Sequence, residues 1–197
     1  MPEFNRRQLF KLRLSDFTRE VGKTVVPPKE GDDQEQRFPR PPGALSNDDA
    51  FPATCERCHA CATACPHNVI QQFGPASGRL EGTPFIDPAA SPCRWCEDMP
   101  CIEVCPSGAL ARDAELPVAP IAKVSLDLDR CLNSLGILCD TCSFRCPTHI
   151  KAIRMENRMP VLDTETCTGC GMCIYHCEAD PSAFDLVITD QPTASAH

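Results

Sequence analysis

The stretch CERCHACATACP, residues 55–66, holds four cysteines that are separated by two, two and three residues and followed directly by a proline. Two intervening residues let the backbone wrap around one corner of a metal cluster while its N–H groups point at the sulfur atoms. Proline disfavours helical backbone at the residue before it, so the chain changes direction at Cys65. The spacing therefore indicates a metal-binding loop whose last thiol serves a second, neighbouring site.

The same pattern occurs four times, so the chain contains an internal repeat. Every block ends in C-x-x-x-C, and the first cysteines of successive blocks lie 38, 38 and 36 residues apart. The last block, CTGCGMCIYHCE at 167–178, keeps the spacing of the first but lacks the proline. Together the blocks contain all the cysteines of the chain: Cys55, Cys58, Cys61, Cys65, Cys93, Cys96, Cys101, Cys105, Cys131, Cys139, Cys142, Cys146, Cys167, Cys170, Cys173 and Cys177.

The second and third blocks depart from this spacing. CRWCEDMPCIEVCP, residues 93–106, widens the middle gap to four residues, and CLNSLGILCDTCSFRCP, residues 131–147, places seven residues between its first two cysteines. A cluster needs four ligands that are close in space, and Gly136 can reverse the chain and return Cys131 to the site. The apolar insert LNSLGIL is then expected to pack beside the cluster and shield it from water.

The choice between disulfides and metal depends on the compartment. Sixteen cysteines in 197 residues are near the level of disulfide-rich secreted chains. The start carries the Arg6-Arg7 pair of an export signal, but KLRLSDFTRE follows it in place of an apolar region. We therefore expect a cytoplasmic protein whose reduced thiols bind metal. The sequence contains no apolar run of about 18 residues, the length that a membrane span needs, so we expect no transmembrane segment.

Other metal chemistry fits the blocks less well. Zinc ribbons separate two C-x2-C pairs instead of placing four thiols close together before a proline. A radical-generating cluster would use C-x3-C-x2-C, which no block contains. We predict four [4Fe–4S] clusters with the sixteen cysteines as ligands. Because thiolates already fill each site, the histidines in or beside the blocks are expected to be packing or solvent residues: His59, His67, His149 and His176.

The charge is unevenly distributed along the chain. The formal net charge is −8, yet residues 1–29 carry seven Lys or Arg against three acids. A nucleic-acid-binding protein would carry a basic stripe across its folded body, so we expect no nucleic-acid partner. Residues 1–26 predict a basic amphipathic helix, which either packs on its own body or docks on a partner. Its apolar residues recur at helical spacing: Phe10, Leu14, Phe17 and Val21.

The rest of the chain divides at the blocks. Residues 27–54, dense in proline and charge, are expected to be an extended, poorly packed linker. Strand-like runs precede the later blocks: TPFID at 83–87, AKVSLDLD at 122–129 and RMPVLD at 158–163. The predicted parts that follow the linker are a first module, a second module and a flexible tail: 55–120, 121–189 and 190–197.

Three stretches resemble one family, the ferredoxin-type accessory proteins of periplasmic nitrate reductase and methylamine utilisation (the NapF/NapG/MauM group), over roughly residues 39–188. They are RPPGAL at 40–45, CRWCEDMPCIEVCPSGAL at 93–110 and CLNSLGILCDTC at 131–142. Cytoplasmic members of this group assist maturation of a molybdenum catalytic subunit, and exported members pass electrons from quinol toward the reductase. The missing apolar region favours the cytoplasmic role.

The resemblance and the blocks together imply an α+β fold. We expect tandem bacterial ferredoxin-like modules with short hairpins and helices, each holding two [4Fe–4S] clusters. Blocks one and two are expected to pair, as are three and four, because each gap contains a hairpin-like segment; a nested pairing of one with four and two with three stays open. In either case Cys65 should leave the cluster of Cys55, Cys58 and Cys61.

No catalytic acid, base or nucleophile stands out, and no phosphate-binding glycine loop is present, so the chain is not predicted to be an enzyme on its own. Three hypotheses remain. The protein is an electron-carrying accessory protein for a molybdenum reductase catalytic subunit or its precursor, a fixed electron-transfer subunit of a larger quinol-linked or molybdopterin oxidoreductase, or a soluble ferredoxin that serves several reductases.

Overall fold

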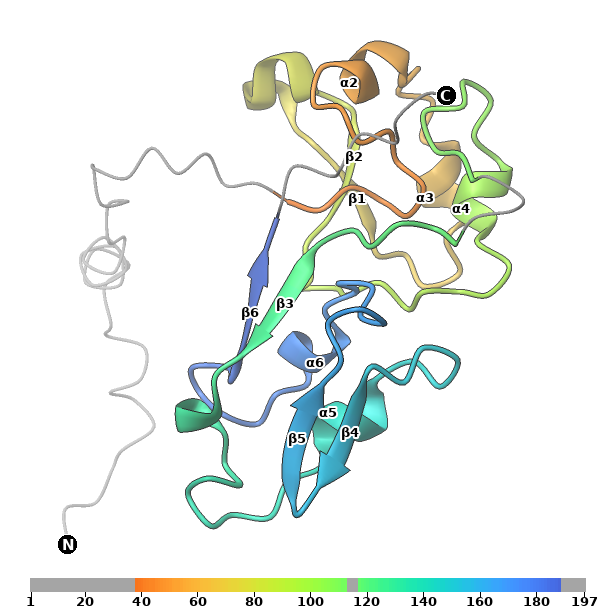
Figure 1. The fold of residues 1–197 in the computed structure, drawn as a ribbon. Coiled ribbons are helices and arrows are strands. Elements are labelled where there is room, and N and C mark those ends of the chain that lie inside the picture. Colours follow the sequence, from red (N-terminus) through yellow and green to blue (C-terminus); the bar gives the residue numbers. More distant parts are fainter. Residues whose placement is uncertain (1–37, 113–116, 189–197) are drawn as a thin grey trace, which may run out of the picture. The chain divides into compact units, whose positions relative to one another are not determined.

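The computed structural model describes residues 38–112 and 117–188, all within one compact unit, residues 37–197. The predicted leader helix at 1–26 and the tail at 190–197 lie outside the described residues. Helices and strands are all short and are joined by long loops (Figure 1). In the part of the chain that is described, no helix is long and apolar enough to cross a membrane.

The elements form two similar groups, which confirms the α+β class. The first group consists of α2 (Ala50–Thr54), α3 (Ala60–Ala64), β1 (Ile70–Gln72), a 3-10 helix (Pro75–Leu80), β2 (Pro84–Ile86) and α4 (Pro100–Glu103). The second consists of β3 (Lys123–Leu126), a 3-10 helix (Leu128–Arg130), α5 (Thr141–Arg145), β4 (Ile153–Glu156), β5 (Met159–Leu162), α6 (Met172–Tyr175) and β6 (Phe184–Val187).

Each described sheet is a two-stranded antiparallel pair. The hairpin β1–β2 joins blocks one and two, with Gln71 opposite Phe85, and β4–β5 joins blocks three and four, with Arg154 opposite Val161. The gap between blocks two and three differs from the expectation. Its strand β3 forms no hairpin and instead pairs with β6 after the last block. Each expected strand run contains a strand.

Residues 38–54 differ from the poorly packed linker that the sequence predicts. Ala44 forms an antiparallel bridge with Leu110, which closes the first group as β3 and β6 close the second. Phe51 is 1% exposed, and the backbone N–H of Ile86 donates to the carbonyl of Pro39 at 2.8 Å. Prolines have no N–H group, so the buried Pro39, Pro41 and Pro42 leave no donor of their own unpaired. The first module therefore begins well before residue 55.

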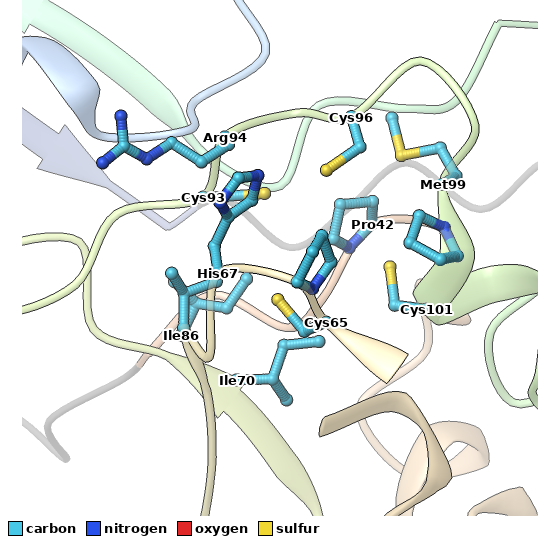
Figure 2. A pocket seen from close by; sticks show the side chains of 13 residues that line it. Pro42, Cys65, His67, Ile70, Ile86, Cys93, Arg94, Cys96, Met99 and Cys101 are labelled. Carbon is cyan, nitrogen blue, oxygen red and sulfur yellow. The ribbon is translucent and has the colours of Figure 1, made fainter. Parts of the chain in front are cut away.

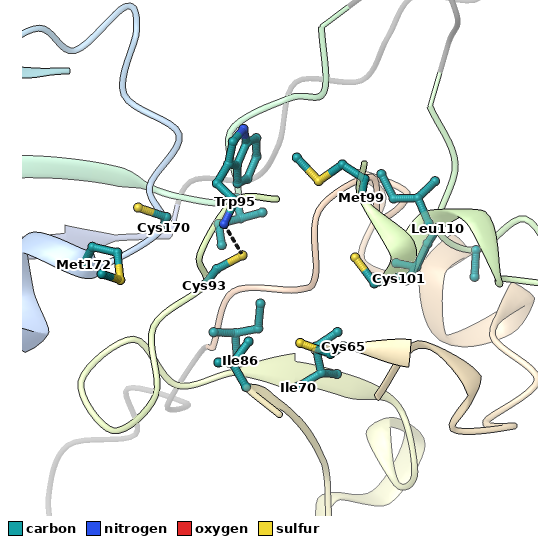
Figure 3. Close-up of a cluster of buried hydrophobic side chains, with 14 of the residues drawn as sticks. Cys65, Ile70, Ile86, Cys93, Trp95, Met99, Cys101, Leu110, Cys170 and Met172 are labelled. Carbon is teal, nitrogen blue, oxygen red and sulfur yellow. Dashed lines mark hydrogen bonds between the residues drawn. The ribbon is translucent and has the colours of Figure 1, made fainter. Parts of the chain in front are cut away.

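The apolar interior consists of two clusters in which cysteines are major members. One lies mainly in the first group and includes Cys93, Trp95 and Met99 (Figure 3). The other lies in the second group around Cys142 and Phe184. Since helices of four or five residues and two-stranded hairpins are marginal alone, contacts around the cysteines hold these elements in place.

Candidate metal centres

Three cysteines of one block and the last cysteine of its partner block line each of three pockets. The first, site one, contains Cys55, Cys58, Cys61 and Cys105. Helix α3 lies in block one and helix α4 in block two. The two helices are in contact, which places Cys105, just after α4, beside the cysteines of block one. The sequential pairing of blocks one and two agrees with this arrangement.

Site two is the complementary pocket of the same module. It is lined by Cys93, Cys96 and Cys101 of block two together with Cys65 of block one, whose sulfur points toward them (Figure 2). Cys65 therefore lies apart from the other cysteines of its own block, as the proline after it predicts.

The second module repeats this exchange. Site four is lined by Cys167, Cys170 and Cys173 with Cys146 of block three. In site three, the thiols of Cys131 and Cys139 lie close enough to Cys142 to raise the pKa of its thiol, after burial as the main cause. The remaining thiol, Cys177, packs against the buried cluster that includes Cys131 and Cys142. Since the last cysteine of each other block lies in the partner site, we assign Cys177 to site three, with Cys131, Cys139 and Cys142.

Backbone N–H groups face several of the sulfur atoms. The N–H of Trp95 donates to Sγ of Cys93, that of Leu110 to Sγ of Cys105 and that of Ala183 to Sγ of Cys177, each at 3.3 Å. Such bonds stabilise negative charge on sulfur. The last two occupy corresponding places in the two modules, immediately before or at the closing strand segment.

The loops that carry these sulfurs share a backbone pattern. Blocks one, two and four place residues with positive φ beside their cysteines: Arg57 and His59, Trp95 and Met99, Gly169 and Gly171. Alternation of left- and right-handed backbone turns successive N–H groups toward one point and makes an anion-binding concavity. A cluster with four thiolates is such an anion, so the loops fit the group that the spacing predicts.

Burial favours the protonated thiols of Cys61, Cys93 and Cys101 when no metal is bound. Burial raises the pKa of Cys93 and Cys101 to about 12, and that of Cys61 to about 11, from an ordinary 9.0. Neighbouring thiols add to the increase in each case. Since thiolates are the ligands, binding of iron must displace these protons.

Iron retention is therefore expected to depend on pH. Cys61, Cys93 and Cys101 each take up a proton on losing iron at any pH below about 11, because burial holds the pKa of each thiol at about 11 or 12. The apparent affinity for iron should fall roughly tenfold per pH unit for each such thiol as pH decreases from 8 to 6. The measurement is the iron content of the protein at equilibrium with a ferrous chelator, whose own affinity for iron is calibrated at each pH. Retention independent of pH would contradict the prediction.

Single-ion sites are not favoured by this geometry. Within residues 38–112 and 117–188, no three His, Cys, Asp or Glu side chains converge closely enough to hold one metal ion. A zinc ion needs its sulfurs at about 2.3 Å and would draw them together. His59 and His67 line the pockets of sites one and two, whereas His149 and His176 line none of the three cysteine pockets.

The LNSLGIL insert reverses the chain at Gly136, which has a φ of 81°. The predicted shielding is wrong, because Leu135, Ile137 and Leu138 are 66%, 54% and 74% exposed. Asn133 explains the difference: its side chain accepts a hydrogen bond from the N–H of Cys139 at 3.1 Å and donates to the carbonyl of the same residue. A polar side chain closes the loop, so the apolar residues need not pack.

Asn133→Ala is expected to destabilise site three, because two backbone groups of Cys139 lose their partner, at about 1 kcal/mol for each hydrogen bond. Iron should be lost from one site in four on mild heating, while the other sites keep theirs. Leu138→Gln is the matched control in the same loop, and its iron content should equal that of the wild type since the leucine is exposed. Equal iron loss in both variants would contradict the assignment.

Two arginines that the sequence did not point to brace the cysteine loops. Arg57, within block one, donates to the carbonyls of Glu81 at 2.8 Å and Arg79 at 3.2 Å, and so holds the 3-10 segment over site one. Arg130, directly before Cys131, binds both Asp127 and Asp185. The cysteine spacing indicates neither role, because Glu81, Arg79 and Asp185 lie far along the chain from the arginine that contacts each of them.

Comparisons with known proteins match both modules. Two 4Fe-4S dicluster domain families match residues 54–109 and 123–178. The ferredoxin-type protein NapG of Escherichia coli (strain K12) is 38% identical over 165 residues, which cover 75% of this chain and 69% of that protein. The methylamine utilization ferredoxin-type protein MauM of Methylobacillus flagellatus is 35% identical over 198 residues, 90% of this chain and 82% of its own length.

A more distant relative carries a different name. The thiosulfate reductase electron transfer subunit PhsB of Salmonella typhi is 28% identical over 148 residues, which cover 69% of this chain and 68% of that protein. All three similarities extend beyond a single module, so they concern the tandem arrangement and not one isolated motif.

Proposed function

The chain belongs to the NapG/MauM group of ferredoxin-type iron–sulfur proteins, and from this premise we propose that it carries four [4Fe–4S] clusters and transfers electrons for a molybdenum-dependent oxidoreductase. One observation carries the count. Twelve of the sixteen cysteines line three pockets by fours, each with the last cysteine of the partner block. We place the other four, Cys131, Cys139, Cys142 and Cys177, in a fourth site by the same exchange. Four thiolates are the complete ligand set of one such cluster.

The protein's role is electron transfer, as in its relatives, and not catalysis. Bound clusters would supply one-electron redox chemistry. The chain's own residues would hold the iron through cysteine thiolates, donate backbone N–H groups to sulfur and exclude water. At site two, the backbone N–H of Trp95 donates to Sγ of Cys93, and its side chain is 5% exposed within the adjoining apolar cluster.

The partner that we propose is a molybdenum catalytic subunit or its precursor, met in the cytoplasm, so that the protein acts as an accessory and maturation factor. Sixteen cysteines suit a reducing compartment such as the cytoplasm, where thiols stay available for metal. The basic segment 1–26 offers a docking element for an acidic partner surface. A second candidate, a fixed electron-transfer subunit of a larger oxidoreductase, is favoured by the similarity to PhsB.

Anaerobic purification with iron and sulfide analysis tests the cluster count. About sixteen irons per chain are expected, and fewer than about twelve would overturn the four-cluster proposal. A redox titration of the same sample would then give the potentials of the sites.

Cross-linking in lysate separates the partner hypotheses. A complex formed only with the precursor of a molybdenum enzyme supports the accessory role, and a stoichiometric complex with a mature oxidoreductase supports the subunit role. Capture of several unrelated reductases would contradict both. Cell fractionation of the same culture tests the cytoplasmic assignment.

A further inference from the structure

The cysteine loops of sites two and four are in direct contact. These loops belong to blocks two and four, which are separated in the sequence by block three. The backbone N–H of Cys93 donates to the carbonyl of Cys170 at 3.0 Å. Cys93 belongs to site two and Cys170 to site four. A close-up shows Cys170 and Met172 beside Cys93 and Trp95 (Figure 3). One hydrogen bond therefore joins a predicted ligand of one site to a predicted ligand of the other.

Glycines make this approach close. A Cβ atom on Gly171 would lie 2.3 Å from Cβ of Pro88, and one on Gly169 would lie 2.1 Å from the carbonyl oxygen of Ala122. Real side chains do not tolerate such distances, so only glycine lets the block-four loop lie against Pro88. The N–H of Ile121 also donates to the carbonyl of Thr168 at 2.9 Å, which fixes the same loop from its other side.

Apolar packing also joins block four to the first module. Cys170 and Met172 of block four belong to the buried cluster of the first module, together with Cys93 and Trp95. The cluster around site three, which includes Cys131 and Cys142, contains only residues of the second module. Site four therefore lies at the boundary between the modules, and site three lies away from it.

We propose that this contact, formed by Cys93, Cys170, Gly171 and Pro88 and called here the junction, positions sites two and four as neighbours. The four sites then form one series in the order one, two, four, three, which differs from their order in the chain. Gly171 and Pro88 are positioning residues in this arrangement. The inference rests on the proposed four-cluster function.

The junction has a consequence for electron transfer. Clusters bound at these sites would supply one-electron redox chemistry. Because electron tunnelling slows steeply with distance, the junction would hold the two inner sites close enough to exchange one electron, one being oxidised as the other is reduced, with no bond or proton transferred. Sites one and three are the outer members of the series.

Paired deletions test the order directly. Cys58→Ala with Cys139→Ala removes sites one and three and leaves sites two and four, whereas Cys58→Ala with Cys173→Ala leaves two and three. Each protein should retain about eight irons. After full reduction, electron paramagnetic resonance should show spin–spin splitting in the first protein and isolated signals in the second. The reverse result, or isolated signals in both, would overturn the inferred order.

A second set of variants keeps all four sites. Gly171→Ala should weaken the spin–spin interaction across the junction and shift the emission of Trp95, the only tryptophan, at unchanged iron content. Gly136→Ala is the matched control, because its φ of 81° resembles the 83° of Gly171 while nothing lies within 4 Å of its added Cβ. Adding Pro88→Gly to Gly171→Ala should partly restore the wild-type spectrum.

Different results contradict the cluster count and the junction. Iron well below sixteen per wild-type chain contradicts the proposed function, whatever the spectra show. Full iron with an unchanged spectrum in Gly171→Ala contradicts the junction and leaves the cluster count standing. If Gly171→Ala does not fold while Gly136→Ala does, the paired deletions decide the order of the sites by themselves.

Discussion

Anaerobic removal of iron from the holoprotein is expected to abolish its tertiary structure. Eight of the twenty-six buried apolar residues in the described part are cysteines that line the sites. The α-helices of the described residues have four or five residues, far below the roughly 12–15 at which an isolated helix becomes marginally stable, and the strands have three or four. Cluster binding therefore supplies folding free energy that local structure cannot.

The measurement is thermal unfolding followed by near-ultraviolet circular dichroism, before and after treatment with a ferrous chelator. The holoprotein should unfold cooperatively, and the iron-free chain should show no cooperative transition. Iron and sulfide added back under reducing conditions should restore the transition, which serves as the control for irreversible damage. An iron-free chain that still melts cooperatively would show that the apolar clusters suffice without metal.

The second large effect is expected for Cys131→Ala, which should remove one cluster, about four of about sixteen irons. Cys131 is 8% exposed, and Arg130 directly before it is held by Asp127 and Asp185. Its thiol lies near Cys142 within site three, so the seven-residue insert does not take it out of reach. Without a fourth thiolate, the three remaining ligands should not retain an intact cluster.

His149→Ala is the control for this prediction. His149 also lies beside block three, but it lines none of the cysteine pockets described, and its Nδ1 faces Glu97 at 3.8 Å. Iron and sulfide analysis of both variants, with the visible absorbance of the clusters, measures the difference. Full iron in Cys131→Ala, or the loss of a cluster in His149→Ala, would refute the assignment of the displaced cysteine.

The spacing of the cysteines predicted much of the fold and of the site. Proline after Cys65 indicated that this thiol leaves its own block, and it lies with Cys93, Cys96 and Cys101. The strand runs at 83–87, 122–129 and 158–163 contain β2, β3 and β5. These features depend on residues that are neighbours in the chain, so a short window of sequence carries them.

Packing was predicted less well. Residues 38–54 have the composition of a linker, yet Phe51 and the neighbouring prolines are almost fully buried. LNSLGIL has the composition of a buried loop, yet three of its apolar side chains are exposed because Asn133 closes the loop instead. Composition describes what a segment could bury, while burial depends on which distant segment lies against it.

The sequence by itself determined that the chain has four cysteine blocks, that each has the thiols for one cluster, and that ferredoxin-like modules are the fold that this spacing fits. Ligand spacing is a short-range property, because backbone geometry limits how far apart two cysteines of one loop can lie. Only the tertiary structure decided that site four, and not site three, lies against site two. That order depends on the contact of Cys93 with Cys170 and of Gly171 with Pro88, residues about eighty positions apart whose contacts no local pattern records.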